Sequence, residues 1–94
     1  MQTIIDRYKG KRTPKGHDLR VDENPDSVTI WILYWGEYEG VDDHHHLGVA
    51  RVRREQGKLA LGVYRGKEQE PSTTRRYDSE EEILAEIDKL VAQR

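Results

Sequence analysis

The run Asp42, Asp43, His44, His45 and His46 holds the densest group of potential metal ligands in the chain. In an extended backbone, successive side chains point to opposite faces, so Asp42, His44 and His46 would lie on one side. Two imidazoles and a carboxylate form a ligand set that zinc, nickel and iron use in proteins. A metal site or a pH-sensitive histidine contact is therefore one interpretation. The run matches no established ligand spacing, however, so we predict a solvated turn with no metal or cofactor.

Residues suited to catalysis are scarce in the rest of the chain. There is no cysteine, and no serine lies in a Gly-x-Ser-x-Gly nucleophile elbow. Glu37 and Glu39 have the spacing of a carboxylate pair on one strand face, but they are also typical of a solvated strand end. The glycines at positions 57, 62 and 66 are not followed by a helix start, which a phosphate-binding loop requires. We therefore predict that the protein is not an enzyme.

The stretch from Val28 to Trp35, VTIWILYW, is the longest apolar run and contains both tryptophans. Its length and its β-branched and aromatic residues indicate a strand. Both of its alternating faces are apolar, whereas a strand with one face in water would alternate apolar and polar residues. Both faces must therefore be covered. A single helix covers only one of them, so the amino-terminal segment or a partner would cover the other.

Large aromatic side chains anchor many protein interfaces, which favours a partner protein, including a second copy of this chain. The predicted protein-binding residues are Trp31, Trp35, Tyr38, Glu37, Glu39, Asp42 and Asp43. The acidic members, together with Asp22, Glu23 and Asp26, would attract a basic partner and speed its association. We interpret the chain as a small non-catalytic binding module that acts as an inhibitor, an immunity-type protein or an adaptor.

Single-stranded nucleic-acid binding is the alternative function. Basic residues of the segment 1–20 and of later strands interleave with tyrosines, as in modules that contact phosphates and stack bases. The residues predicted for this alternative are Arg51, Arg53, Arg54, Arg65, Arg75, Arg76 and Tyr64. The formal net charge of -2 argues against it, because strong phosphate binding usually accompanies a basic domain.

The composition predicts a single small domain over residues 1–94 with a thin core, since 36% of the residues are charged and 34% are hydrophobic. The lack of cysteine excludes a disulfide framework. The amino terminus lacks the apolar core of a signal peptide and no segment is long enough to span a bilayer, so we expect a cytoplasmic protein without membrane contact. Charge alternates in blocks along the chain, which favours attraction between neighbouring elements.

The amino-terminal half is expected to contain mainly strands. We predict a basic, partly flexible arm over residues 1–20, in which residues 2–8 form a short strand and the glycine-containing stretch 10–18 forms a loop. Residues 17–21 would form an edge strand. The central strand follows a turn at DENPDS and runs from Val28 to Trp35, or as far as Tyr38.

A hairpin is predicted next, with strands over residues 47–54 and 58–65 around a loop at 55–57. Pairing Arg54 with Lys58 sets its register and divides its residues between two faces. One face would carry Leu47, Val49, Leu59, Leu61 and Val63 beside Arg51, Arg53 and Arg65. The other would carry Gly48, Ala50, Val52, Ala60, Gly62 and Tyr64. Because small residues allow close packing, we expect the helix to lie on this second face.

The carboxy-terminal segment carries the strongest helix signal. Ser79 and Glu82 have the spacing of a capping box, and acidic residues fill the first turn, where the helix dipole favours them. An apolar stripe at helical spacing then predicts a helix over residues 79–93. Residues 73–77 would add a last edge strand. The fold class is therefore α+β, with a curled antiparallel sheet of four to five strands and one C-terminal helix packed across one face.

Overall fold

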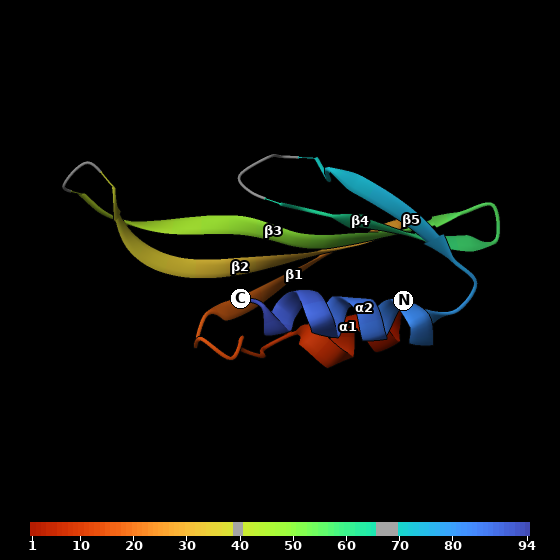
Figure 1. Ribbon diagram of the computed structural model, residues 1–94, viewed down its shortest axis with the longest axis horizontal. Helices are drawn as coiled ribbons and strands as arrows, with labels where there is room; N and C mark the ends of the chain where they lie inside the picture. The colour runs from red at the N-terminus through yellow and green to blue at the C-terminus, as the bar shows by residue number, and fades with distance from the viewer. Residues whose placement is uncertain (39–40, 66–69) are drawn as a thin grey trace.

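The computed structural model describes the backbone of residues 1–38, 41–65 and 70–94, and their side chains except those of residues 34–38 and 41–45. Five strands form one antiparallel sheet and two helices lie together on one side of it (Figure 1). The order along the chain is α1 (Gln2–Tyr8), β1 (Asp18–Asn24), β2 (Ser27–Tyr38), β3 (Val41–Glu55), β4 (Lys58–Val63), β5 (Thr73–Tyr77) and α2 (Glu80–Ala92). The α+β class, the antiparallel sheet and the C-terminal helix packed on one face are confirmed. Neither described helix has the length and apolar composition needed to cross a membrane.

The core lies between the sheet and the two helices. The alternate β2 residues Val28, Ile30 and Ile32 are buried on this side, and the helices contribute residues such as Ile4 and Ile83. We call this side the helix-covered face. The other side, on which the β2 residues Thr29, Trp31 and Leu33 lie, is called the open face. The strict alternation of a strand is what divides the apolar run of β2 between the two.

A bulge in β3 adjusts the pairing at the middle of the sheet. Ile30 lies opposite Ala50, but the next residue of β2, Trp31, lies opposite Gly48, so Val49 is the extra residue. Both Val49 and Ala50 are buried in the core, as expected where a bulge turns two successive residues toward the same side. The bulge thereby places Gly48, the smallest residue, beside Trp31 on the open face.

The turn between β3 and β4 gives the hairpin a different register from the predicted one. Gln56 and Gly57 both have positive φ, 47° and 80°, and Glu55 pairs with Lys58, so the hairpin has a two-residue turn of the type that fits the strand twist. The predicted pairing of Arg54 with Lys58 is wrong by one residue. A one-residue slip moves every side chain of a strand to the other face.

The corrected register changes which residues accompany the arginines. Leu59 and Leu61 now share the helix-covered face with Val52, and the helices pack over this aliphatic set. The small residues Ala60 and Gly62 instead join Arg51 and Arg53 on the open face, since they are their direct partners across the strands (Gly62 with Arg51, Ala60 with Arg53). The prediction that the helix lies on the small-residue face is therefore wrong for Ala60 and Gly62 of β4, whereas Ala50 and Val52 of the same predicted face do lie under the helices.

β2 and β3 extend beyond the strands that flank them. β1 pairs with β2 only from Ser27 to Leu33, and β4 pairs with β3 only from Ala50 to Glu55. Figure 1 shows the two long strands continuing together past the helices. The molecule measures 47 Å along its longest axis and 23 and 22 Å along the others. The stretch 42–46, predicted as a turn, forms part of β3.

The amino-terminal segment differs from its prediction. Residues 2–8 form a helix instead of a short strand, with Ile4, Ile5 and Tyr8 buried. α1 has seven residues and no side-chain cap at its start, so packing rather than local propensity must hold it. Farther along the same segment, Thr13 is buried and its hydroxyl donates to the carbonyl of Arg94 (3.3 Å). The predicted arm therefore contains residues that pack against the body of the protein.

α2 begins where the sequence indicates. Ser79 is the N-cap, and its hydroxyl accepts a hydrogen bond from the amide of Glu82 (3.4 Å). Three glutamates occupy the first turn, and one of them, Glu80, lies 3.4 Å from the amino group of Met1. Ile83 and Ile87 supply the buried stripe.

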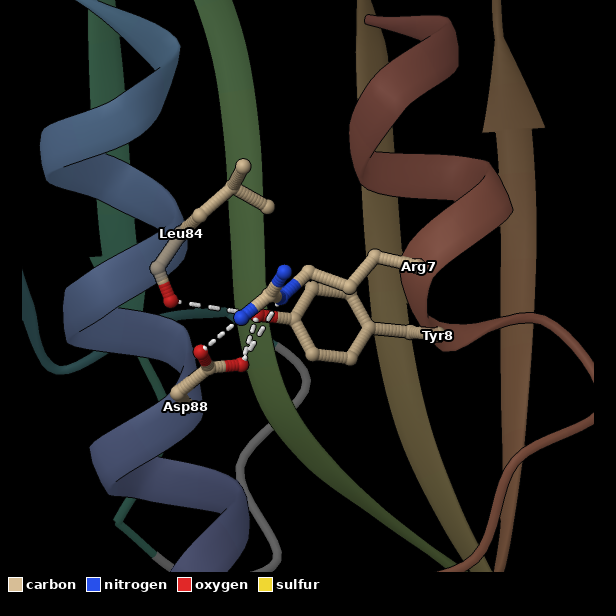
Figure 2. Close-up of polar contacts among 4 residues, drawn as sticks. All are labelled: Arg7, Tyr8, Leu84 and Asp88. Carbon is tan, nitrogen blue, oxygen red and sulfur yellow. Dashed lines mark hydrogen bonds and ion pairs between the residues drawn. The ribbon is translucent and has the colours of Figure 1, made fainter.

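A polar contact joins the two helices, as Figure 2 shows. The Tyr8 hydroxyl donates to Asp88 Oδ1 (2.6 Å) and also lies 3.2 Å from the carbonyl oxygen of Leu84. The Arg7 guanidinium binds both oxygens of the same carboxylate. The hydrogen bond from Arg7 is the main reason that the pKa of Asp88 is lowered. The pKa of Tyr8 is raised, first by burial and then by Asp88.

Replacing Asp88 by Asn should weaken this contact and alter acid stability. A lowered carboxyl pKa stabilises the folded state above the unfolded-state pKa of about 3.9, and this stabilisation is lost as the pH falls through the folded-state value. Because the contact is partly exposed, solvent screening limits its contribution to stability. We expect Asp88→Asn to lower the free energy of unfolding by about 1 kcal/mol at pH 7. Below pH 4 the difference in free energy of unfolding between Asp88→Asn and the wild type should become smaller.

Urea denaturation at a series of pH values measures both effects. Glu86→Gln is the matched control, because it removes an acidic side chain of the same helix that contacts Lys89 rather than α1. The control should follow the wild-type profile within about 0.5 kcal/mol. A gap between Asp88→Asn and the wild type that stays constant down to pH 2 would contradict the assigned role of this carboxylate.

Candidate protein-binding surface

The open face has no helix over it in the part of the chain that the structure describes. Trp31 and Leu33 are partly exposed there, while Thr29, on the same face of β2, is only 3% exposed. The register places further residues on this face: Arg20 and Asp22 of β1, Arg51 and Arg53 of β3, Ala60 and Gly62 of β4, and Thr74 and Arg76 of β5. The face therefore combines a small aromatic and aliphatic area with several guanidinium groups.

Tyr64 covers part of the open face with its ring. A Cβ atom at Gly48 would lie 2.5 Å from Tyr64 Cγ, so the ring rests directly on the glycine backbone. The ring centroid is 5.7 Å from that of Trp31, and Tyr64 is only 1% exposed. Burial raises the pKa of the Tyr64 hydroxyl, against the opposing effect of the Arg51 charge. Gly48 is thus required because the backbone must make room for an aromatic ring.

Arg51 is held by three neighbours on this face. Its Nε donates to Thr29 Oγ1 (3.2 Å), its Nη1 donates to Glu70 Oε2 (2.8 Å), and its guanidinium lies 5.8 Å from the centre of the Tyr64 ring. Its side chain is 16% exposed, whereas that of Glu70 is 76% exposed. The arginine is therefore fixed in position, and the glutamate reaches it from solvent.

A hollow of about 200 Å³ lies beside Arg51. Its lining comprises Arg51, Arg53, Glu55, Ala60, Gly62, Glu70, Pro71 and Thr74. Pro71 lies close above the β4 backbone, since a Cβ at Gly62 would be 2.6 Å from Pro71 Cγ. The amide of Ser72 donates to the carbonyl of Val63 (2.9 Å) and so keeps this segment against the end of β4. The hollow can hold a small polar group.

Trp31 is the member of the predicted protein-binding set whose side chain is described. Its ring lies on the open face, and its Nε1 atom is buried without a hydrogen-bond partner among the described residues. The side chains of Trp35, Tyr38, Glu37, Asp42 and Asp43, and all of Glu39, lie outside the described residues. The backbone pairing places Trp35 opposite His44 and Glu37 opposite Asp42. The predicted acidic residues are therefore divided. Glu37 and Asp42 belong to the end of β2 and β3 that is far from Arg53, whereas Asp22 and Glu23 lie on β1 and the carbonyl of Asp26 accepts from the Arg54 amide (3.2 Å).

The proposed metal ligands are only partly described. The side chains of Asp42 and His44 lie outside the described residues, and His46 is exposed in a hollow beside Trp31, Arg20 and Asp22. Within the described residues, no group of three or more potential ligands comes together. The absence of a metal site stays a prediction.

The residues predicted for nucleic-acid binding divide between the faces. Arg51, Arg53, Arg76 and Tyr64 lie on the open face. Arg54 and Arg75 occupy register positions of the helix-covered face, opposite Leu59 and Leu61, and Arg65 follows the end of β4. Because Tyr64 is buried, it offers no free ring for a base.

Sequence reasoning missed Glu70, Pro71 and Thr74. The sequence contains only an indirect sign of the hollow that they line. With the observed hairpin register, the small residues at positions 60 and 62 lie opposite the arginines at positions 53 and 51, and the predicted register hides this pairing. Comparison of the chain with protein-family models, with curated proteins and with solved structures found no match. The side chains of the open face therefore carry the functional interpretation.

Gly48→Ala should destabilise the protein because the new methyl group collides with the Tyr64 ring. Overpacking of this kind costs about 1–3 kcal/mol. In a Tyr64→Ala background the collision is absent, so the same substitution should cost less than about 1 kcal/mol. Chemical denaturation of the four proteins completes a double-mutant cycle. An equal cost of Gly48→Ala in both backgrounds would refute the contact between the ring and this glycine.

Proposed function

We propose that this chain is a non-catalytic binding module that acts through protein–protein interaction, with the open face of the sheet as its contact surface. The observation that carries the proposal is the partly exposed pair Trp31 and Leu33 on a face that no described helix covers. A large aromatic side chain on a rigid sheet is a typical interface anchor, because it buries much area with little loss of side-chain entropy.

The environment of Trp31 suits a rigid contact residue. Its indole Nε1 is buried and has no hydrogen-bond partner among the described residues. The Tyr64 ring lies 5.7 Å from the Trp31 ring and is itself next to the Arg51 guanidinium, which gives the tryptophan rigid surroundings.

The charges of the open face fit a partner protein with both acidic and basic groups. Near β5, Arg76 lies 3.4 Å from Glu55, and near β1, Arg20 binds Asp22 (2.9 Å). Such exposed pairs are weak and exchange readily for pairs with a partner. The predicted acidic residues at the far end of β2 and β3, Glu37 and Asp42, would face basic groups. An inhibitor, an immunity-type protein, an adaptor or a homodimer would each use a surface of this kind.

Single-stranded nucleic-acid binding is a second candidate, favoured by the gathering of Arg51, Arg53 and Arg76 on one face. Two features weigh against it. Arg51 and Arg76 already contact carboxylates, and the Tyr64 ring is not available for stacking. Base stacking supplies much of the affinity in such modules.

Trp31→Ala should weaken partner binding strongly while leaving the fold intact. Peptides selected from a random displayed library against the wild-type protein serve as probes, and their affinities are measured by fluorescence anisotropy. An aromatic anchor is worth about 2 kcal/mol or more, so affinity for Trp31→Ala should fall by at least about 20-fold. Ala85→Ser, on the exposed side of α2, is the control and should bind normally.

The same variants separate the two functions. Light scattering that shows a concentration-dependent dimer, lost in Trp31→Ala, would identify a second copy of the chain as the partner and support the proposal. Salt-sensitive binding of an oligothymidine that Trp31→Ala retains and Arg53→Gln loses would support the second candidate instead. Selected peptides that bind Trp31→Ala as well as the wild type would refute the open face as the contact surface.

A further inference from the structure

Two arginines and a floor of small residues form a polar recess on the open face. Arg51 and Arg53 are alternate residues of β3, so both guanidinium groups belong to the same side of the sheet. Their partners on β4, Gly62 and Ala60, carry almost no side chain, and Thr74 on β5 closes the far side. The resulting hollow of about 200 Å³ has room for a carboxylate and the carbon that bears it.

The recess already holds one carboxylate in the isolated chain. Glu70 Oε2 accepts from Arg51 Nη1 at 2.8 Å, and the Nε of the same guanidinium is occupied by Thr29. Arg51 is mostly buried, so its orientation is set before any ligand arrives. An oriented guanidinium binds carboxylates through short, charge-assisted hydrogen bonds.

Arg53 has a guanidinium that no described carboxylate of the recess binds. Glu70 binds Arg51, and Glu55 lies 3.4 Å from Arg76, whereas Arg53 is exposed and has no ion-pair partner among the described residues. The described lining holds two arginines and two glutamates, so its formal charge is zero. The Arg53 guanidinium is open to an added carboxylate because Glu55 pairs with Arg76 instead.

Glu70 is weakly held. Its side chain is 76% exposed, and an ion pair in such a position contributes about 0–1 kcal/mol. Its displacement by another carboxylate therefore costs little. While Glu70 occupies Arg51, it competes with any incoming anion for the same donor.

We propose that the recess between Arg51 and Arg53 binds an acidic side chain of the partner protein, and that Glu70 occupies it as an internal competitor until the partner arrives. The inference rests on the proposed protein-binding function and specifies the chemistry of the partner: a carboxylate placed next to an apolar residue. The apolar residue of the partner would lie against Trp31, because the Tyr64 ring is next to both the Trp31 ring and the Arg51 guanidinium. Glu70 thereby sets the affinity of the open face.

Titration with glutarate, a soluble dicarboxylate, tests the recess without the partner. Nitrogen-15 NMR follows the Arg51 side-chain Nε–H and the Gly62 amide in the wild type, Glu70→Gln, Arg53→Gln and Arg54→Gln. Arg54→Gln is the matched control, since it removes the same charge one residue away, at a position of the other face. We expect chemical-shift changes that saturate with glutarate. The affinity for glutarate should be about two- to fivefold higher in Glu70→Gln, which corresponds to the free energy of the weak ion pair that is removed. Arg53→Gln should weaken binding several times more than Arg54→Gln.

Three results would overturn the proposal. These are equal weakening by Arg53→Gln and Arg54→Gln, an unchanged affinity in Glu70→Gln, and shifts that sodium chloride reproduces at the same ionic strength. Inorganic phosphate that binds more tightly than glutarate, with the same dependence on Arg53, would assign the recess to a phosphate group instead. Failure of the glutarate titration with Trp31-dependent peptide binding intact would refute the recess alone. If glutarate binds as expected but the selected peptides bind Trp31→Ala as well as the wild type, the proposed function alone would be refuted.

Discussion

The two-residue turn at Gln56 and Gly57 is the constraint on which the rest of the structure depends. Because side chains alternate along a strand, the turn decides which residues of β4 enter the core beside those of β3 and which face outward. With Glu55 opposite Lys58, the leucines of β4 meet the helices and the small residues meet the arginines. A turn one residue longer would put Ala60 and Gly62 on the helix-covered face and the leucines beside the arginines, because the pairing of β3 with β2 fixes the face of the arginines.

Within the described residues, long side chains rather than a second layer of helices cover part of the open face. Tyr64 lies flat on Gly48, and Arg51 lies beside the Tyr64 ring and donates to Thr29. Long side chains laid along a sheet shield the backbone and the smaller residues beneath them. The cover is incomplete, and Trp31 stays partly exposed at its margin. The face thus combines a packed centre with a partly exposed aromatic margin.

The elements with strong local signals were predictable from the sequence, and those held by distant contacts were not. The capping box at Ser79 and the apolar run of β2 gave the last helix and the central strand their correct positions. α1 has only two turns, and its polar anchor Asp88 lies about 80 residues away, so no nearby residue indicates it. The arginines of the site were recognised from composition, whereas their surroundings depended on the bulge at Val49 and on the turn, which alternation alone does not reveal.

The two outermost strands have a consequence for how the molecule behaves at high concentration. β1 carries Asp18, Arg20, Asp22 and Glu23, and β5 carries Arg75 and Arg76. A row of charged side chains along the rim of a sheet opposes endless strand-to-strand stacking between molecules, the route that leads to fibrils. The charged rims thereby disfavour growth of the sheet by addition of further strands.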